Sequence, residues 1–152
     1  MPDFRILVVA PGPRSGYWAY VTAGCWSAVN ADGHGIEFVM MSQRREQAVL
    51  DILAMVAFYH ADHHLDHWHS VPIGEPWLPG SSCDHLLVSL PYMHGPELEE
   101  CDLPEGHARL LWLLPITSAE RDFRRQHDTE ALEQRFDDVG IDPTDPLRAS
   151  VV

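Results

Sequence analysis

The sequence predicts a single domain of the α/β (α+β) class, because strand-like and helix-like segments both occur along one chain of 152 residues. Short apolar runs bounded by proline or glycine have the length and composition of β-strands. Other segments repeat their apolar residues at helical spacing or carry helix-capping residues. A chain of this length buries one hydrophobic core, so one domain spanning residues 1–152 is expected.

Three strands are expected near the N-terminus. Phe4–Val9 is a short apolar run closed by Pro11. The stretch 17–29 is rich in aromatic and β-branched residues and contains one interrupting glycine. The residues at 30–35 favour a turn, so Ile36–Met41 is expected to pair with the second strand as a hairpin.

A helix is expected from Arg44 to about Tyr59, followed by a segment of mixed character. Leu65, His67 and His69 would share one face of a short strand there. The prolines that follow exclude a central strand in the next stretch. The apolar residues that recur at helical spacing in the expected helix are Val49, Ile52, Leu53, Val56 and Tyr59.

The second half of the sequence predicts two buried strands. His85–Leu90 and Ala108–Leu114 are nearly continuous apolar runs that end at Pro91 and Pro115. The residues between them, 97–105, are expected to form an acidic loop.

Two further helices are expected after these strands, which brings the total to about three. Thr117 and Glu120 have the spacing of a reciprocal capping box. The last helix should begin at Asp128 and end at Gly140, which suits the left-handed residue at a helix end. The final twelve residues are expected to be extended across the surface.

The charge of the chain excludes one class of partner. The sequence has 10 basic and 23 acidic residues, contains no lysine and carries a formal charge of −13. A nucleic-acid surface needs an excess of basic side chains, so no nucleic-acid partner is expected. Residues 97–152 hold 6 of the bases and 14 of the acids. The acidity is therefore concentrated in the last third of the chain, where a basic partner is expected to bind.

The sequence favours a cytoplasmic location with no membrane association. No apolar run approaches the roughly 20 residues that span a bilayer, and the N-terminus lacks a signal-peptide pattern. The three cysteines are far apart and show no C-x-x-C spacing, so reduced thiols are expected. The sequence sets no expectation for the oligomeric state.

A cluster of histidines raises the alternative of a metal-dependent enzyme. If the first helix continued past Tyr59, histidines four residues apart would be able to reach one Zn²⁺. The sequence has no H-E-x-x-H motif, and charged histidines at a helix end also interact favourably with the helix dipole. No metal and no cofactor are therefore expected. The members of the cluster are His60, His63, His64, His67 and His69, with Asp62 and Asp66 among them.

The sequence contains no recognisable catalytic or nucleotide-binding motif. Cys83, Asp84 and His85 are adjacent, but a nucleophile and its base are seldom sequence neighbours. There is no G-x-S-x-G elbow and no glycine-rich phosphate loop. We therefore expect a protein that is not an enzyme.

Two tryptophans are candidates for binding a partner. Trp68 and Trp77 lie in an irregular, proline-rich segment, and tryptophan is enriched at protein interfaces. The alternative is that both cover the core from outside.

Several stretches resemble one known family. Residues 74–92, with the sequence GEPWLPGSSCDHLLVSLPY, are similar to the suppressor of fused domain in its bacterial form. Residues 111–117 together with Glu120, and residues 130–133, fit the same pattern. The resemblance extends from about residue 18 to the C-terminus.

The resemblance implies a mixed, mainly antiparallel sheet flanked by helices and a role in holding another protein. It also implies that Tyr59 and Asp66 contact a bound peptide. Bacterial members of this family are proposed to be immunity proteins that neutralise toxins. We therefore expect a non-enzymatic protein-binding domain, with a basic toxin as a candidate partner. A scaffold domain of a signalling assembly is the alternative.

Overall fold

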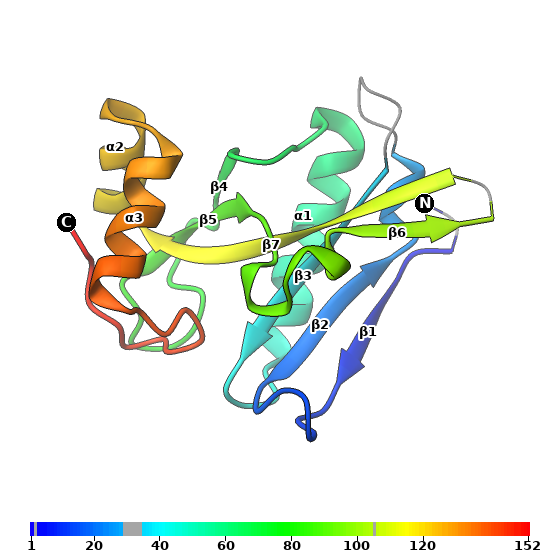
Figure 1. Cartoon of the computed structure of the whole chain (residues 1–152), viewed down its shortest axis with the longest axis horizontal. Coiled ribbons are helices and arrows are strands. Elements are labelled where there is room, and N and C mark those ends of the chain that lie inside the picture. Colours follow the sequence, from blue (N-terminus) through cyan, green and yellow to red (C-terminus); the bar gives the residue numbers. More distant parts are fainter. Residues whose placement is uncertain (2, 29–34, 105) are drawn as a thin grey trace.

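The computed structural model describes residues 1, 3–28, 35–104 and 106–152, and its centre is one twisted sheet (Figure 1). The strand order is β1-β2-β3-β7-β5-β4, and β6 pairs with β7 outside this path. The β3–β7 pair is parallel and the other pairs are antiparallel. The predicted mixed, mainly antiparallel sheet is thus confirmed. The strands are β1 (Arg5–Val9), β2 (Trp18–Ala23), β3 (Gly35–Ser42), β4 (Ser70–Pro72), β5 (Cys83–Ser89), β6 (Glu100–Leu103) and β7 (Gly106–Thr117).

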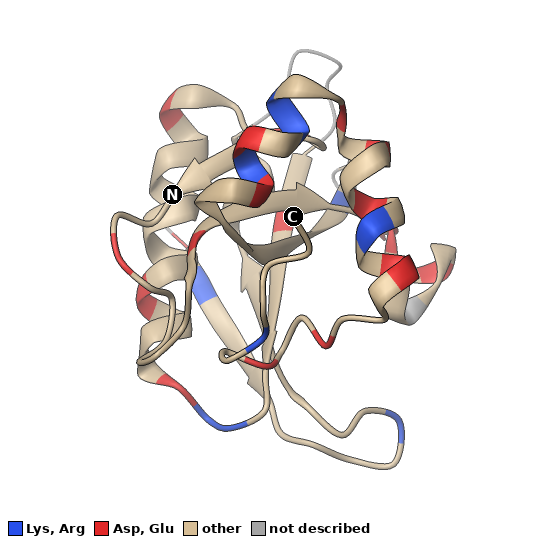
Figure 2. Cartoon of the chain, turned by 90° about the vertical axis from the view of Figure 1, so that its left-hand side faces the viewer, with Lys and Arg blue, Asp and Glu red and all other residues tan. Residues whose placement is uncertain are grey.

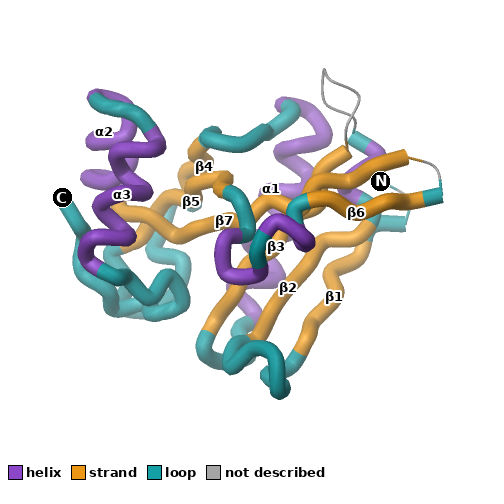
Figure 3. The backbone as a smooth tube through the Cα atoms, viewed as in Figure 1, coloured by secondary structure: helices purple, strands orange, loops and turns teal. Residues whose placement is uncertain are grey.

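Three α-helices accompany the sheet in the described part of the chain, as predicted (Figure 3). They are α1 (Gln47–His63), α2 (Ser118–Gln126) and α3 (Thr129–Val139). Three short 3₁₀ turns, η1 (Cys25–Ser27), η2 (Tyr92–His94) and η3 (Pro96–Leu98), join other elements. No helix among the described residues has both the length and the apolar character needed to cross a bilayer.

The central strands β3, β5 and β7 are largely buried on both faces because different helices cover each side. Alternate residues of β3, β5 and β7 pack with α1 in one core, which includes Phe38, Leu86 and Leu113. The intervening residues, such as Leu87 and Trp112, pack with α3 and the C-terminal segment in a second core. This two-sided packing explains why the central strands are nearly continuous apolar runs.

Two predicted boundaries were wrong, one at the end of the first helix and one at Pro115. Helix α1 continues four residues beyond Tyr59 and ends where His64 takes a left-handed conformation. Pro115 lies inside β7, because its pairing with β5 extends past the end of the β3 pairing at Trp112. A proline is tolerated there because, among the described residues, β7 pairs with a strand on one side only beyond Trp112.

One predicted loop and one predicted strand also differ from the structure. The acidic stretch after Pro96 is not an open loop, because β6 forms an antiparallel hairpin with β7. The strand expected from Leu65 is confined to β4, and residues 64–69 form a loop instead. The edge position of β4 agrees with the prolines that exclude a central strand. Most of the turn predicted at 30–35 lies outside the described residues.

The predicted features of the last two helices are confirmed. The Thr117 side chain accepts from the Glu120 amide at 3.1 Å, while the Glu120 carboxylate accepts from the Thr117 amide at 2.8 Å. Asp128 caps α3 by accepting from the amide of Ala131 at 2.7 Å. Gly140 ends α3 in the left-handed region with φ 66°. Residues 141–152 then run without regular secondary structure.

Candidate functional site

The predicted histidine cluster does not converge on one point. His60 is fully buried, with Nε2 3.2 Å from the carbonyl oxygen of Ala28. The His63 ring packs against Tyr59, with ring centroids 4.3 Å apart. His64 occupies the left-handed position that ends α1. The structure brings the rings of His60 and His64 edge to face, with centroids 6.2 Å apart, but His63 packs separately against Tyr59.

The geometry gives little support to a metal site in this cluster. His69 is engaged locally, since its Nδ1 accepts from the amide of Asp66 at 3.0 Å. Burial lowers the pKa of His67, and the positive charge of Arg109 lowers it further, while Asp66 opposes the change. Across residues 1, 3–28, 35–104 and 106–152, no three His, Cys, Asp or Glu side chains are grouped to hold a metal ion.

Asp66 anchors the 64–69 loop to the sheet. Its Oδ1 lies 3.3 Å from Nη1 of Arg109 on β7 and accepts from the amide of His67 at 2.7 Å. Both partners of the ion pair are partly exposed, so the pair is worth about 1 kcal/mol or less. Asp66 is therefore positioned at the surface and remains accessible to a partner.

Trp68 combines wide exposure with an unfavourable backbone conformation. Its φ is 73°, a left-handed value that a bulky residue rarely adopts, and 57% of the residue is exposed. The backbone is fixed on both sides, because its amide donates to the Val88 carbonyl at 2.8 Å and its carbonyl accepts from Arg124 Nη1 at 2.7 Å. Neighbouring elements thus hold the Trp68 backbone while its ring remains at the surface.

The other two predicted binding residues are placed differently from each other. Tyr59 is 44% exposed near the end of α1 and joins the exposed side of that helix. Trp77 is only 1% exposed and belongs to the core between α1 and the sheet. Tyr59, Asp66 and Trp68 together form what we call the loop surface. Trp77 is not part of it, because its side chain is buried.

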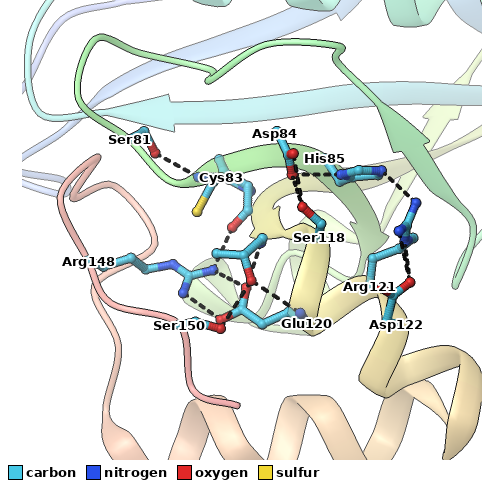
Figure 4. A network of polar contacts seen from close by, with 12 residues as sticks. Ser81, Cys83, Asp84, His85, Ser118, Glu120, Arg121, Asp122, Arg148 and Ser150 are labelled. Atoms are coloured by element: carbon cyan, nitrogen blue, oxygen red, sulfur yellow. Dashed lines mark hydrogen bonds and ion pairs between the residues drawn. The ribbon is translucent and has the colours of Figure 1, made fainter.

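A polar network at the start of β5 joins Asp84, His85, Ser118 and Arg121 (Figure 4). Arg121 donates to Nε2 of His85 at 3.0 Å, so the His85 proton lies on Nδ1, which donates to Asp84 at 2.7 Å. Ser118 donates to Asp84 at 3.0 Å and not to the histidine. Burial alone would raise the pKa of Asp84, but the hydrogen bonds from His85 and Ser118 outweigh it and lower that pKa. Both nitrogens of His85 are occupied, so it cannot serve Ser118 as a base.

The neighbouring part of the network is structural. Burial raises the pKa of Cys83, which keeps the thiol protonated and weakly nucleophilic. Arg148 forms two hydrogen bonds of 2.7 Å with the buried carboxylate of Glu120 (Figure 4). The Pro115 carbonyl accepts from the same guanidinium at 2.8 Å. These contacts attach the C-terminal segment to α2 and β7.

A groove between α3, η2 and the sheet was not predicted from the sequence. It has a volume of about 720 Å³ and a floor that includes the side chains of Trp112, Leu114 and Phe136. Figure 2 views the molecule from the side of α2 and α3 and shows acidic positions recurring along these helices. The regularly spaced carboxylates of α3 are visible in the sequence and indicate one acidic side of this groove. Its floor and rim come from segments that are distant in the sequence. The groove carboxylates are Glu130, Glu133, Asp137 and Asp142.

Hydrogen bonds shape the rim of this groove. The Glu133 carboxylate accepts from Ser89 Oγ at 2.7 Å and from the Tyr92 hydroxyl at 3.3 Å. Partial burial raises the pKa of Tyr92 to about 12, and the negative charge of Glu133 adds to this effect. Tyr92 therefore remains protonated and can donate to Glu133 at neutral pH.

Comparisons with known proteins agree on one family. A family model described as Suppressor of fused protein (SUFU) matches residues 2–149. A crystal structure of a protein described as a SUFU homolog from Neisseria gonorrhoeae FA 1090 is 38% identical, with a TM-score of 0.86. That match covers 100% of this chain and 80% of the other. No curated protein matches the sequence.

Two more distant structures share the fold. A crystal structure of the Sufu–Fu complex gives a TM-score of 0.69 at 13% identity, covering 97% of this chain and 76% of the other. Drosophila Suppressor of Fused gives 0.67 at 14% identity, covering 97% of this chain and 42% of the other. With the family model matching nearly all of the sequence, the chain belongs to the suppressor of fused family.

Proposed function

We propose that this chain is a non-enzymatic domain that binds another protein through the loop surface. The observation that carries the proposal is the exposed, left-handed Trp68, whose amide and carbonyl are both held by hydrogen bonds. A strained residue persists only where its surroundings enforce it, and such residues cluster at functional sites. Tryptophan is also enriched among the residues that dominate binding energy.

Two neighbouring features support the same surface. Tyr59 adds a second exposed aromatic side chain, and Asp66 adds a partly exposed carboxylate. The Sufu–Fu complex supports a protein as the class of partner, because a structural relative was crystallised with one. The Asp84 and His85 network favours binding over catalysis, since it leaves no free base beside a nucleophile.

We further propose that the partner is a basic protein in the cytoplasm, with a toxin that this domain neutralises as the specific case. The formal charge of −13 would steer a positively charged partner toward the domain and speed association. This assignment rests on charge and on membership of the family.

The proposal is tested by capturing partners from the native cell with wild-type and Trp68→Gly proteins. Glycine accepts the left-handed backbone of position 68, so this variant removes the ring without adding strain. We expect a partner that binds the wild type to be lost or weakened at least about tenfold, the effect of removing an interface hot spot. The matched control is Leu147→Ala, which shortens another widely exposed apolar side chain.

Two results would contradict these proposals separately. Equal capture by wild type and Trp68→Gly would exclude the loop surface as the binding site. The toxin assignment requires that the captured protein slows growth when expressed alone and that co-expression of this domain restores growth. A captured protein that leaves growth unchanged would reject that assignment and favour a scaffold role.

A further inference from the structure

The groove beside α3 is a second surface, and it shares no residue with the loop surface. Its floor is apolar, and Tyr92 and Met93 on its rim are 55% and 46% exposed. Its volume of about 720 Å³ is within the range of pockets that bind organic ligands. The floor therefore offers room for an apolar side chain from a partner.

The charge around this groove has a single sign. Glu130, Glu133, Asp137 and Asp142 line it, and its lining within the described part of the chain contains no arginine. None of these four carboxylates forms an ion pair within the described residues. A basic partner would therefore supply the positive charge that these carboxylates lack within the domain.

The carboxylates on α3 are ordered along its length. Glu130, Glu133 and Asp137 are separated by three and four residues, so they share one face of the helix. From Glu130 to Asp137 the helix rises roughly 10 Å, at about 1.5 Å per residue. An extended chain covers the same distance in about three residues.

We propose that this groove binds an extended segment of a partner protein, in which an apolar side chain is flanked by two arginines or lysines about three residues apart. The apolar side chain fits against Trp112 and Phe136 on the floor, and the basic side chains pair with the α3 carboxylates. This inference rests on the proposed function, because it assigns a second contact to the same kind of partner.

Other occupants fit the groove less well. A second copy of this chain has no lysine and the same excess of negative charge, so it would be repelled. A nucleic acid would be repelled for the same reason. A bound cation needs converging ligands, and the described residues contain no group of three that could hold one. A basic segment with an apolar anchor matches both the charge and the floor.

The experiment uses a short synthetic peptide with a leucine between two arginines three residues apart. Its binding to the ¹⁵N-labelled full chain is followed by NMR chemical shifts. We expect the amides of α3 and of the residues around Tyr92 to shift. A peptide with glutamates in place of the arginines, and one with serine in place of the leucine, are both expected to bind at least about fivefold more weakly.

Matched double variants test the charge directly. The double variant Glu130→Gln with Asp137→Asn should weaken binding of the arginine peptide by roughly five- to tenfold. Asp51→Asn with Asp62→Asn removes the same charge from exposed positions on α1 and should change binding less than about twofold. Equal weakening by both pairs would overturn the groove assignment, since net charge alone would then explain binding.

The location of the shifts separates this proposal from the proposed function. Shifts confined to the 64–69 loop, or no shifts at all, would overturn the groove assignment and leave the loop surface intact. Loss of native partner capture in Trp68→Gly together with an unchanged peptide affinity would support two separate contacts. A native partner that Trp68→Gly still captures would reject the proposed function without altering the peptide result.

Discussion

His60 is a residue whose ionisation opposes folding. Its ring is fully buried and meets Phe38 edge to face, with centroids 5.3 Å apart at 83°. Burial lowers its pKa from the usual 6.5, the Ala28 carbonyl opposes this change, and His64 adds to it. The folded state thus keeps His60 neutral in a pH range where the unfolded chain is protonated.

Acidification should therefore destabilise the protein through His60. Its contribution to the free energy of unfolding is present above 6.5 and is lost as the pH falls toward its lower pKa in the folded state. We expect at most about 1.4 kcal/mol per pH unit from this residue. Urea unfolding between about pH 7 and about pH 5 measures the effect, and His60→Gln should reduce it. His127→Gln, at an exposed position, is the control and should leave this pH dependence unchanged. An unchanged pH dependence in His60→Gln would contradict the role of His60.

The C-terminal segment is an element held by one buried ion pair. Arg148 and Glu120 are both buried, and the Glu120 carboxylate also accepts from the Thr117 and Val151 amides. Burial would lower the pKa of Arg148, but its hydrogen bonds with Glu120 outweigh it and raise that pKa. The pair connects residues 28 positions apart, so it is a tertiary contact between α2 and the C-terminal segment.

Removing one partner of this pair should be costly. Arg148→Ala leaves the Glu120 carboxylate buried without a counter-charge, and we expect a loss of about 3–5 kcal/mol in the free energy of unfolding. Urea unfolding measures this loss, with the exposed Arg125→Ala as the control expected within about 0.5 kcal/mol. Adding Glu120→Gln to Arg148→Ala should recover part of the stability, because the unpaired charge is removed. A loss below about 1 kcal/mol in Arg148→Ala would show that the pair does not hold the segment.

Elements defined by local chemistry could be predicted, whereas those defined by distant partners could not. The Thr117 and Glu120 capping box lies within four consecutive residues and was predicted correctly. By contrast, Pro115 lies inside a strand because of where β3 stops pairing. The strand β7 begins at Gly106, two residues before the predicted start at Ala108, and its first residues pair with β6. The acidic content of that segment gave no indication of this pairing.

The two proposed binding surfaces also differ in how far they could be predicted from the sequence. Tyr59, Asp66 and Trp68 were selected from a resemblance and from residue type, and the structure leaves all three accessible. Trp77 has the same residue type as Trp68 but is buried, because the core between α1 and the sheet encloses it. The groove combines Tyr17, residues 89–93 and residues 130–143, so only the fold brings its parts together.

The excess of negative charge should make the stability of the whole molecule depend on salt. With a formal charge of −13, carboxylates repel one another more in the compact fold than in the expanded unfolded chain. Raising NaCl from about 10 to about 150 mM shortens the screening length from roughly 30 to roughly 8 Å. We expect the free energy of unfolding in urea, an uncharged denaturant, to rise by roughly 1 kcal/mol. Glu130→Gln with Asp137→Asn should show a smaller rise, and a decrease with salt would mean that ion pairs such as Asp66–Arg109 outweigh the repulsion.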